Sequence, residues 1–256
     1  MSLQACADLV ARGDPDRFAA AMAAPVAARR VLFPLYAFNV EIARAPWVTE
    51  EPLIAEMRLQ WWRDALAEIA GGGPVRRHEV TDPLAEVLDA ETARILDKAV
   101  AARLWDVHKD PFEDADAFSA HLDATAGHLM WAAARALGAA PDTEPVVRDY
   151  AWGAGLAAWL QAIPELEARG RRPLVDGRPG AVQALARDGL HRIKRARRSR
   201  HGIGATARPA LYAGWQGAGL LRQAAATPAR VAEGTLALAE ARKRAGLLWV
   251  AATGRW

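Results

Sequence analysis

Two histidines and one cysteine are the side chains best suited to metal or nucleophilic chemistry. His121 and His128 stand seven residues apart in a segment with a helical pattern. They share a helix face but lie two turns apart, whereas one ion is chelated by histidines at positions i and i+4. We therefore interpret both as core or surface histidines. Cys6, the single cysteine, offers neither an internal disulfide nor a thiolate metal site, which is typical of a reducing compartment.

A glycine-rich run near the C-terminal end, Gly214 to Gly219, superficially resembles a nucleotide-binding loop. Such a loop follows a β-strand, and no strand pattern precedes this run. We assign its glycines to close packing between helices.

Basic side chains concentrate between residues 187 and 200, where Asp188 alone opposes them. The run is either a solvated helix face or a surface for an anionic membrane or an acidic partner, because a local basic patch attracts polyanions whatever the net charge. Nucleic acid is disfavoured, since neither a recognition motif nor a row of aromatic residues accompanies the patch. The patch comprises Arg187, Arg192, Lys194, Arg195, Arg197, Arg198 and Arg200.

The elements that position these residues are predicted to be helices. The chain is rich in Ala, Leu and Arg and lacks an alternating strand pattern, repeats and long linkers, so we predict one all-α domain over residues 1–256. Prolines and glycines divide it, with a start signal at Asp14-Pro15 and a stop at Gly71–Gly73. The first predicted helix begins at Pro15. Further helices are predicted over Val26–Ala45, Pro52–Ile69, Pro83–Leu88, Ala90–Asp106, Ala115–Leu137, Pro145–Leu166, Ala181–Ser199, Arg208–Gln223 and Pro228–Ala251.

No segment has the pattern of a secretory signal or a membrane span. The first residues include early acids and no apolar core, and the uncharged stretch Tyr150–Pro164 is shorter than the ~20 residues that cross a bilayer. We expect a cytoplasmic protein, either soluble or peripheral on the inner membrane.

Three segments together resemble the squalene/phytoene synthase family, which joins prenyl diphosphates head to head. Arg29–Asn39 is similar to the family's R-x-x-x-x-A-L-Y-A-F helix, and Arg58–Leu66 closely matches R-L-x-W-W-R-x-x-L. Gly170-Arg171 stands where the family has its G-R-x-Y-L-P turn. The spacing of these anchors extends the resemblance over nearly the whole chain. It implies the isoprenoid synthase fold, a multi-helix bundle around a central cavity.

The resemblance also implies two aspartate-rich motifs, which hold Mg²⁺ against the diphosphate of the substrate. At the aspartate positions of the first motif this chain has Ala43, Arg44 and Trp47, and at those of the second it has Ala162 and Leu166. None of these side chains is a metal ligand. We therefore expect no catalytic residue, no metal site and no cofactor.

The glutamates nearest to these positions are not expected to replace the missing aspartates. Glu41 lies two residues before Ala43, which rotates it about 200° around the helix, and Glu165 lies one residue before Leu166. We expect both carboxylates to lie away from the cavity.

The segments that replace the aspartate motifs in this chain resemble those of one branch of the family. This branch contains the mitochondrial complex I assembly factor and its bacterial relatives. The shared elements are Phe38–Ala43, Glu56–Trp62 and Leu160–Pro164. The resemblance implies a non-catalytic protein that assists respiratory complex I assembly at the membrane, with a respiratory-complex subunit or assembly factor as its partner. The alternative is an active prenyl transferase with degenerate metal motifs, which would use Mg²⁺.

For both the non-catalytic protein and the active transferase, we expect a cavity of lipid size. It would hold a lipid, a prenyl chain or a quinone-like tail. Trp61 and Trp62 point about 100° apart on a helix, so one can line the cavity while the other packs against a neighbour. Arg44 either receives an anionic head group or pairs with Glu41. The expected lining residues are Tyr36, Trp61, Trp159 and Gln161.

Overall fold

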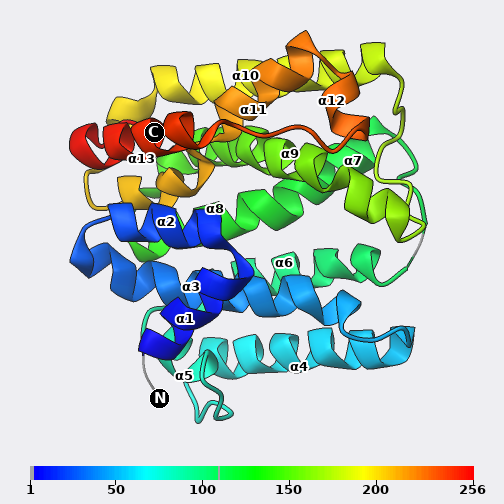
Figure 1. Ribbon diagram of the computed structural model, residues 1–256. Helices are drawn as coiled ribbons and strands as arrows, with labels where there is room; N and C mark the ends of the chain where they lie inside the picture. The colour runs from blue at the N-terminus through cyan, green and yellow to red at the C-terminus, as the bar shows by residue number, and fades with distance from the viewer. Residues whose placement is uncertain (1–2, 109) are drawn as a thin grey trace.

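The protein folds into a stack of helices, which a computed structural model describes for residues 3–108 and 110–256 (Figure 1). No β-strand occurs in these residues, so the predicted all-α class is confirmed. The α-helices are α1 (Leu3–Gly13), α2 (Pro15–Ala23), α3 (Val26–Arg44), α4 (Pro52–Gly71), α5 (Thr81–Ala85), α6 (Ala90–Ala102), α7 (Ala115–Leu122), α8 (His128–Ala136), α9 (Glu144–Ala168), α10 (Pro179–Arg198), α11 (Gly217–Ala226), α12 (Ala229–Ala232) and α13 (Glu240–Thr253).

Helix ends follow the local signals in the sequence. The Asp14 side chain accepts a hydrogen bond of 3.0 Å from the Arg17 amide, and Pro15 follows as the first residue of α2. Such a cap satisfies a backbone donor that the first turn leaves free. At the other end of α4, Gly72 adopts φ 68°, a left-handed conformation that glycine enters without strain. The predicted boundaries at Asp14 and Gly71–Gly73 are confirmed.

The long helix α9 runs through the middle of the stack, between α8 on one side and α10 and α11 on the other (Figure 1). Its residues Tyr150, Leu156 and Leu160 have no exposed surface. On the far side of α8, α3 contributes Leu32 and Phe38 to the same hydrophobic core. α4 forms the outer layer beyond α3 (Figure 1). In the described residues, no helix combines the length and the apolar character that a membrane span needs.

The predicted continuous helix Ala115–Leu137 is wrong in its middle. A π-helical turn, Asp123–Gly127, separates α7 from α8. The Thr125 hydroxyl donates to the His121 carbonyl oxygen at 2.7 Å inside this turn. Wide turns of this kind are frequent at functional sites, and this one faces the cavity described below.

The predicted helix Pro228–Ala251 is also wrong, because α12 ends after a single turn. Gly234 adopts φ 67° and its amide donates to Val231, while the Thr235 amide donates to the Arg230 carbonyl oxygen at 3.0 Å. This pair of bonds is a Schellman cap, which stops a helix at a left-handed glycine. The chain then runs extended to α13, which starts at Glu240.

The predicted helix Arg208–Gln223 consists of a 3₁₀ segment, Arg208–Gly214, and the start of α11. The glycines between them lie against α9. A Cβ atom on Gly214 would stand 2.5 Å from a ring carbon of Tyr150, and one on Gly217 would stand 3.1 Å from the Cα atom of Ala154. The assignment of this glycine-rich run to close helix packing is confirmed.

Candidate functional site

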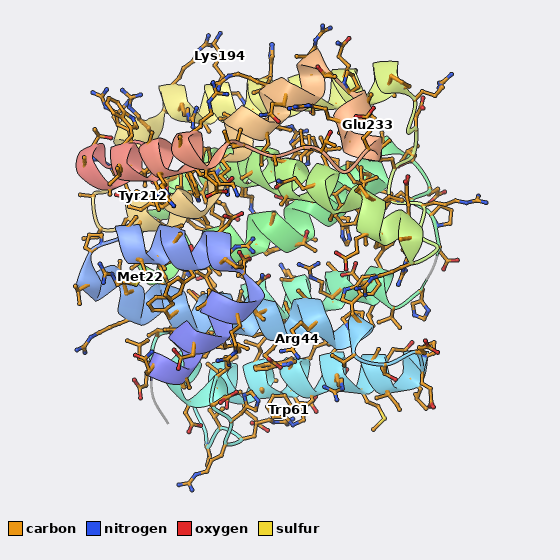
Figure 2. All side chains as sticks on the ribbon, in the orientation of Figure 1. Met22, Arg44, Trp61, Lys194, Tyr212 and Glu233 are labelled. Atoms are coloured by element: carbon orange, nitrogen blue, oxygen red, sulfur yellow. The ribbon has the colours of Figure 1, made fainter. Side chains whose placement is uncertain are left out.

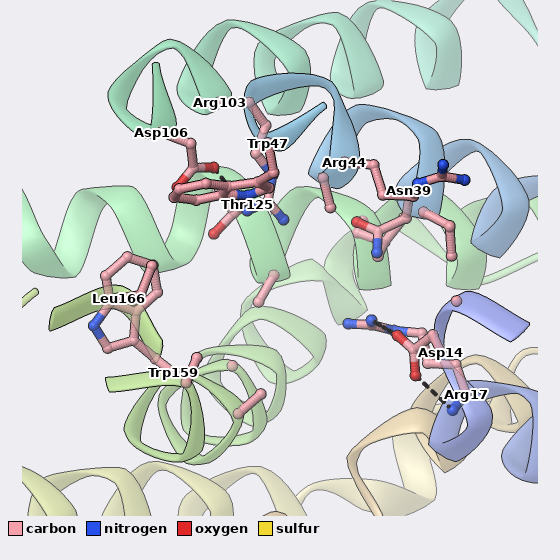
Figure 3. Close-up of a pocket in the computed structure, with 18 of the residues that line it drawn as sticks. Asp14, Arg17, Asn39, Arg44, Trp47, Arg103, Asp106, Thr125, Trp159 and Leu166 are labelled. Carbon is pink, nitrogen blue, oxygen red and sulfur yellow. Dashed lines mark hydrogen bonds and ion pairs between the residues drawn. The ribbon is translucent and has the colours of Figure 1, made fainter. Parts of the chain in front are cut away.

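A cavity of about 470 Å³ opens between α3, α8 and α9, closed at its ends by the start of α2 and the turn after α6 (Figure 3). Its apolar wall is formed by Leu122, Leu129, Trp159 and Leu166. Small residues of α9, among them Gly155 and Ala158, leave the space open. A volume of this size suits a small molecule or part of a lipid chain.

The cavity brings together all five positions that correspond to the family's aspartates. Ala43, Arg44 and Trp47 reach it from the end of α3 and the 3₁₀ turn that follows, while Ala162 and Leu166 reach it from α9. Residues four apart on a helix share a face, which explains the last pair. The site of the aligned motifs is therefore one place in space, although its side chains are not metal ligands.

Arg44 and Trp47 are both held by neighbours. The Arg44 guanidinium lies 3.6 Å from the Glu41 carboxylate on its own helix, although its side chain remains mostly exposed. The Trp47 indole lies under two guanidinium groups, with Arg169 at 4.6 Å and Arg171 at 5.2 Å from the ring centroid. Cation–π contacts of this geometry are attractive, so the indole is fixed at the mouth of the cavity.

Three carboxylates that the sequence analysis missed or misplaced also line the cavity: Asp14, Asp106 and Glu165. The prediction that Glu165 lies off this face is wrong, because the cavity is wide enough to include the edge of α9. Two of the three acids belong to segments outside the aligned motifs. Only the packing of the turn after α6 and of the start of α2 against α3 and α9 brings them there.

Each of these carboxylates is paired with an arginine. Asp14 binds Arg17, Glu165 lies 2.6 Å from Arg169, and Asp106 lies 3.1 Å from Arg103. Figure 3 shows the Asp14–Arg17 pair and the Arg103–Asp106 pair at opposite ends of the cavity. Each carboxylate is therefore neutralised locally by its own arginine.

Asp106 is buried, and burial raises the pKa of its carboxyl group, an effect that the neighbouring Arg103 opposes. Beside it, Arg171 donates to the backbone carbonyl oxygens of Trp105, Asp106 and His108. Arg171 thus ties the loop after α9 to the turn after α6. This assigns a structural role to the arginine of the predicted Gly170-Arg171 turn.

The side chains at the five motif positions do not fit a bound Mg²⁺. Magnesium takes oxygen ligands, usually one or two carboxylates together with waters and substrate phosphates. At the motif positions the structure places methyl, isobutyl, indole and guanidinium groups. Within residues 3–108 and 110–256, no group of three or more His, Cys, Asp or Glu side chains is arranged to hold a metal ion.

A smaller inner chamber of about 130 Å³ adjoins the cavity and shares Arg17 and Ala158 with it. Tyr36 and Gln161 line this chamber and not the main cavity. The Tyr36 hydroxyl is buried without a hydrogen-bond partner in the described residues, and burial raises the pKa of this group. The Gln161 side-chain amide donates to the Leu236 carbonyl oxygen at 2.9 Å.

Trp159 lines the main cavity, whereas Trp61 lies outside it and lines a separate, smaller pocket that also includes Arg44. The side chains of the two adjacent tryptophans point in different directions, as their separation of about 100° around the helix requires. Trp62 is buried edge-on against Phe38 of α3, with ring centroids 5.4 Å apart. Trp61 turns outward beneath the guanidinium of Arg76 and lies on the outer side of α4 (Figure 2).

His121 is a core residue, as interpreted from the sequence. It packs among the rings of Trp105, Phe112 and Trp159, with centroids between 5.2 and 5.3 Å away. Burial lowers the pKa of His121 to about 3, so the ring is neutral. His128 is half-buried, and its Nδ1 atom lies 2.8 Å from the carbonyl oxygen of the preceding turn.

Part of the basic run on α10 is used for internal contacts. Arg192 stacks on the Trp152 ring at 3.9 Å, and Arg195 pairs with Asp149 at 2.5 Å. Arg197 donates to the backbone of the C-terminal residue. Four other exposed members form no ion pair within 4.0 Å in the described part of the chain; these are Arg187, Lys194, Arg198 and Arg200.

The family model described as squalene/phytoene synthase matches residues 10–256 of the chain. Assembly factor 6 of NADH dehydrogenase (ubiquinone) complex I from Bos taurus is 29% identical over 107 residues, which are 37% of this chain and 32% of that protein. Its homolog from Drosophila melanogaster is 26% identical over 205 residues, covering 77% of this chain and 60% of that protein. The chain thus matches about a third of the bovine relative and 60% of the fly relative.

A crystal structure of a dehydrosqualene synthase in complex with ligand matches the fold with a TM-score of 0.81. The two chains are 14% identical, and the match covers 98% of this chain and 95% of the other. At this identity the likeness shows the fold. The predicted isoprenoid synthase fold is confirmed.

Proposed function

The chain belongs to the squalene/phytoene synthase family, and from that premise we propose that it is a non-catalytic member that assists the assembly of respiratory complex I. Its proposed location is the cytoplasmic side of the inner membrane, where its partner would be a subunit or another assembly factor of that complex. The names of the bovine and fly relatives support this role.

One observation carries the non-catalytic half of the proposal: the replaced motif positions converge on a single cavity. Ionisation of an allylic diphosphate builds up several negative charges, which the family neutralises with carboxylate-bound metal. Here Ala43, Ala162 and Leu166 offer no ligand, and Arg44 adds positive charge where a cation would have to bind. The surrounding carboxylates are engaged by arginines.

The cavity suits a ligand with an apolar body and an anionic head. Leu122, Leu129 and Trp159 provide an apolar wall, while Arg44 and Arg169 stand near the mouth. An arginine can bind a phosphate or carboxylate directly and bidentately, without an intervening metal. The pairing of Arg44 with Glu41 competes with such a ligand, but at 3.6 Å and with high exposure this pair is weak.

The direct test of the non-catalytic role is incubation of the protein at micromolar concentration with farnesyl or geranylgeranyl diphosphate and Mg²⁺. We expect no release of diphosphate above the rate without protein. A family enzyme that retains both aspartate motifs serves as the positive control. Robust release by this protein would contradict the proposal.

The assembly role is tested by deleting the gene and measuring assembled NADH:quinone oxidoreductase together with the isoprenoid profile. We expect loss of the assembled complex with unchanged isoprenoids. Loss of a carotenoid or hopanoid with intact respiration would refute this role and support an enzyme.

One observation favours the second candidate, an active prenyl transferase with degenerate motifs: Asp14, Asp106 and Glu165 line the cavity. This function would require that at least two of them exchange an arginine for Mg²⁺ when substrate binds. Activity that disappears in Asp14→Asn or Asp106→Asn, with the fold intact by circular dichroism, would establish it.

A further inference from the structure

The outer face of α13 is apolar, although it points away from the rest of the protein. The Leu248 side chain is 70% exposed and Trp249 is 57% exposed, whereas Val250 on the inner face is buried. On that inner face, Gly246 packs closely on the ring of Trp215. One side of the helix therefore holds it to the protein, and the other side presents large hydrophobic groups to the surroundings.

These groups belong to a continuous stripe. Ala241, Ala245, Leu248 and Ala252 are all exposed, and their spacing places them on one face of the helix. Trp249 flanks this face. A helix that merely covered the protein would carry polar residues here, so the outer face of α13 has the character of an interface.

The residues that follow α13 tie the chain to the last turn of α10, while α13 itself packs on α2. The Arg197 Nε atom donates to the Trp256 carbonyl oxygen at 2.9 Å, and the buried Trp256 ring packs edge-on against Tyr150, with centroids 4.6 Å apart. The C-terminal ends of α10 and α13 lie at the same end of the molecule (Figure 1). We call the outer face of α13 together with the last turn of α10 and the residues up to Arg200 the C-terminal surface.

The C-terminal surface belongs to the most basic part of the chain. Residues 191–200 and 240–256 contain ten basic residues and one acidic residue, whereas the whole chain has a net charge of +3. The rest of the protein is therefore net negative, and the molecule is electrically polarised. Arg198, Arg200, Arg242 and Arg244 are exposed on this surface, and Lys194 projects from the outer side of α10 (Figure 2).

We propose that the C-terminal surface docks onto an anionic lipid bilayer, with α13 lying in the plane of the interface. Leu248 and Trp249 would enter the boundary between head groups and acyl chains, where tryptophan is favoured. The arginines on either side would face the head groups. This inference rests on the proposed membrane location, and it names the face that makes the contact.

Charge complementarity selects this occupant over a second copy of the chain. Two C-terminal surfaces placed face to face would repel each other, because each carries a large excess of positive charge. An anionic bilayer offers both negative charge and an apolar layer beneath it. The C-terminal surface offers positive charge to the head groups and exposed apolar side chains to the layer beneath them.

A second exposed apolar patch provides the matched control. Leu53 and Met57 at the start of α4 are 67% and 63% exposed, and the charged residues next to them, Glu51, Glu56 and Arg58, sum to a net negative charge. An apolar patch with a net negative border does not suit an anionic membrane, so this patch is not expected to contribute to lipid binding.

The test is sedimentation of the full chain with vesicles of phosphatidylcholine, with and without phosphatidylglycerol, at low and high salt. We expect binding to the anionic vesicles that weakens as salt rises. Each basic residue near such a surface contributes about fivefold to binding, so Arg242→Gln/Arg244→Gln is expected to weaken it about 25-fold. Leu248→Ser/Trp249→Ser should weaken binding at both salt concentrations, because it removes the apolar contribution.

The control variants Leu53→Ser/Met57→Ser and Arg187→Gln should bind like the parent chain. Parent-like binding by both C-terminal variants would overturn the inference and leave the membrane location intact. Failure of the parent chain to bind either vesicle would overturn the inference and the location together, while the deletion assay would still decide the assembly role. Binding that is equal on neutral and anionic vesicles, or capture of an acidic protein without vesicle binding, would also overturn it.

Discussion

Arg171 is expected to contribute more to stability than any exposed arginine, because it joins two loops at the mouth of the cavity. Its guanidinium donates to the backbone carbonyl oxygens of Trp105, Asp106 and His108, and its side chain is only 6% exposed. Hydrogen bonds from a charged donor contribute about 1.5–3 kcal/mol each. Burial lowers the pKa of Arg171, because desolvation disfavours its charged form, and this cost offsets part of the gain. We expect Arg171→Met to lower the free energy of unfolding by about 3–5 kcal/mol.

The assay is equilibrium unfolding in urea, followed by circular dichroism. The neighbouring Arg172 is exposed, so Arg172→Met provides a control of identical chemistry and should change stability by less than about 0.5 kcal/mol. Arg171→Lys should give an intermediate loss, because an ammonium group cannot span three carbonyl oxygens as a guanidinium fork does. A loss below about 1 kcal/mol for Arg171→Met, or equal losses for the two arginines, would refute the reasoning.

Three further predictions concern the core. Gly214→Ala should destabilise the protein by about 1–3 kcal/mol, because its Cβ would meet a tyrosine ring at 2.5 Å, whereas Gly177→Ala, with nothing within 4 Å, should be neutral in the same urea assay. Trp62→Ala should cost about 3–5 kcal/mol and the half-buried Trp61→Ala clearly less; equal losses would contradict the assigned orientations. The pKa of His121 is about 3 when folded and about 6.5 when unfolded, so the unfolded chain binds more protons between these values. Stability should therefore fall by up to about 1.4 kcal/mol per pH unit below about pH 6.5, and His121→Phe should reduce this slope; an unchanged slope would refute the burial argument.

Much of the fold could be predicted because its signals are local. Asp14 before Pro15 starts a helix through a side chain three residues from its target, and Gly72 ends one through its own backbone. The Schellman glycine Gly234 is an equally local signal, but the apolar pattern that continues beyond it predicts an unbroken helix. The π-helical turn at Asp123–Gly127 has no comparable mark, since every residue in it is compatible with an ordinary helix.

The absence of aspartates at Ala43 and Ala162 can be read directly from the chain, and so can the family to which these positions belong. The sequence does not indicate which charged side chains lie close together in the folded protein. Asp106 reaches the cavity from a turn that no motif marks, and Arg171 reaches that same turn across 65 residues of chain. Helical periodicity reports the face on which a residue lies, but the partner of that face depends on how whole helices pack. For that reason the pairing of acids with arginines around the cavity emerges from the folded protein alone.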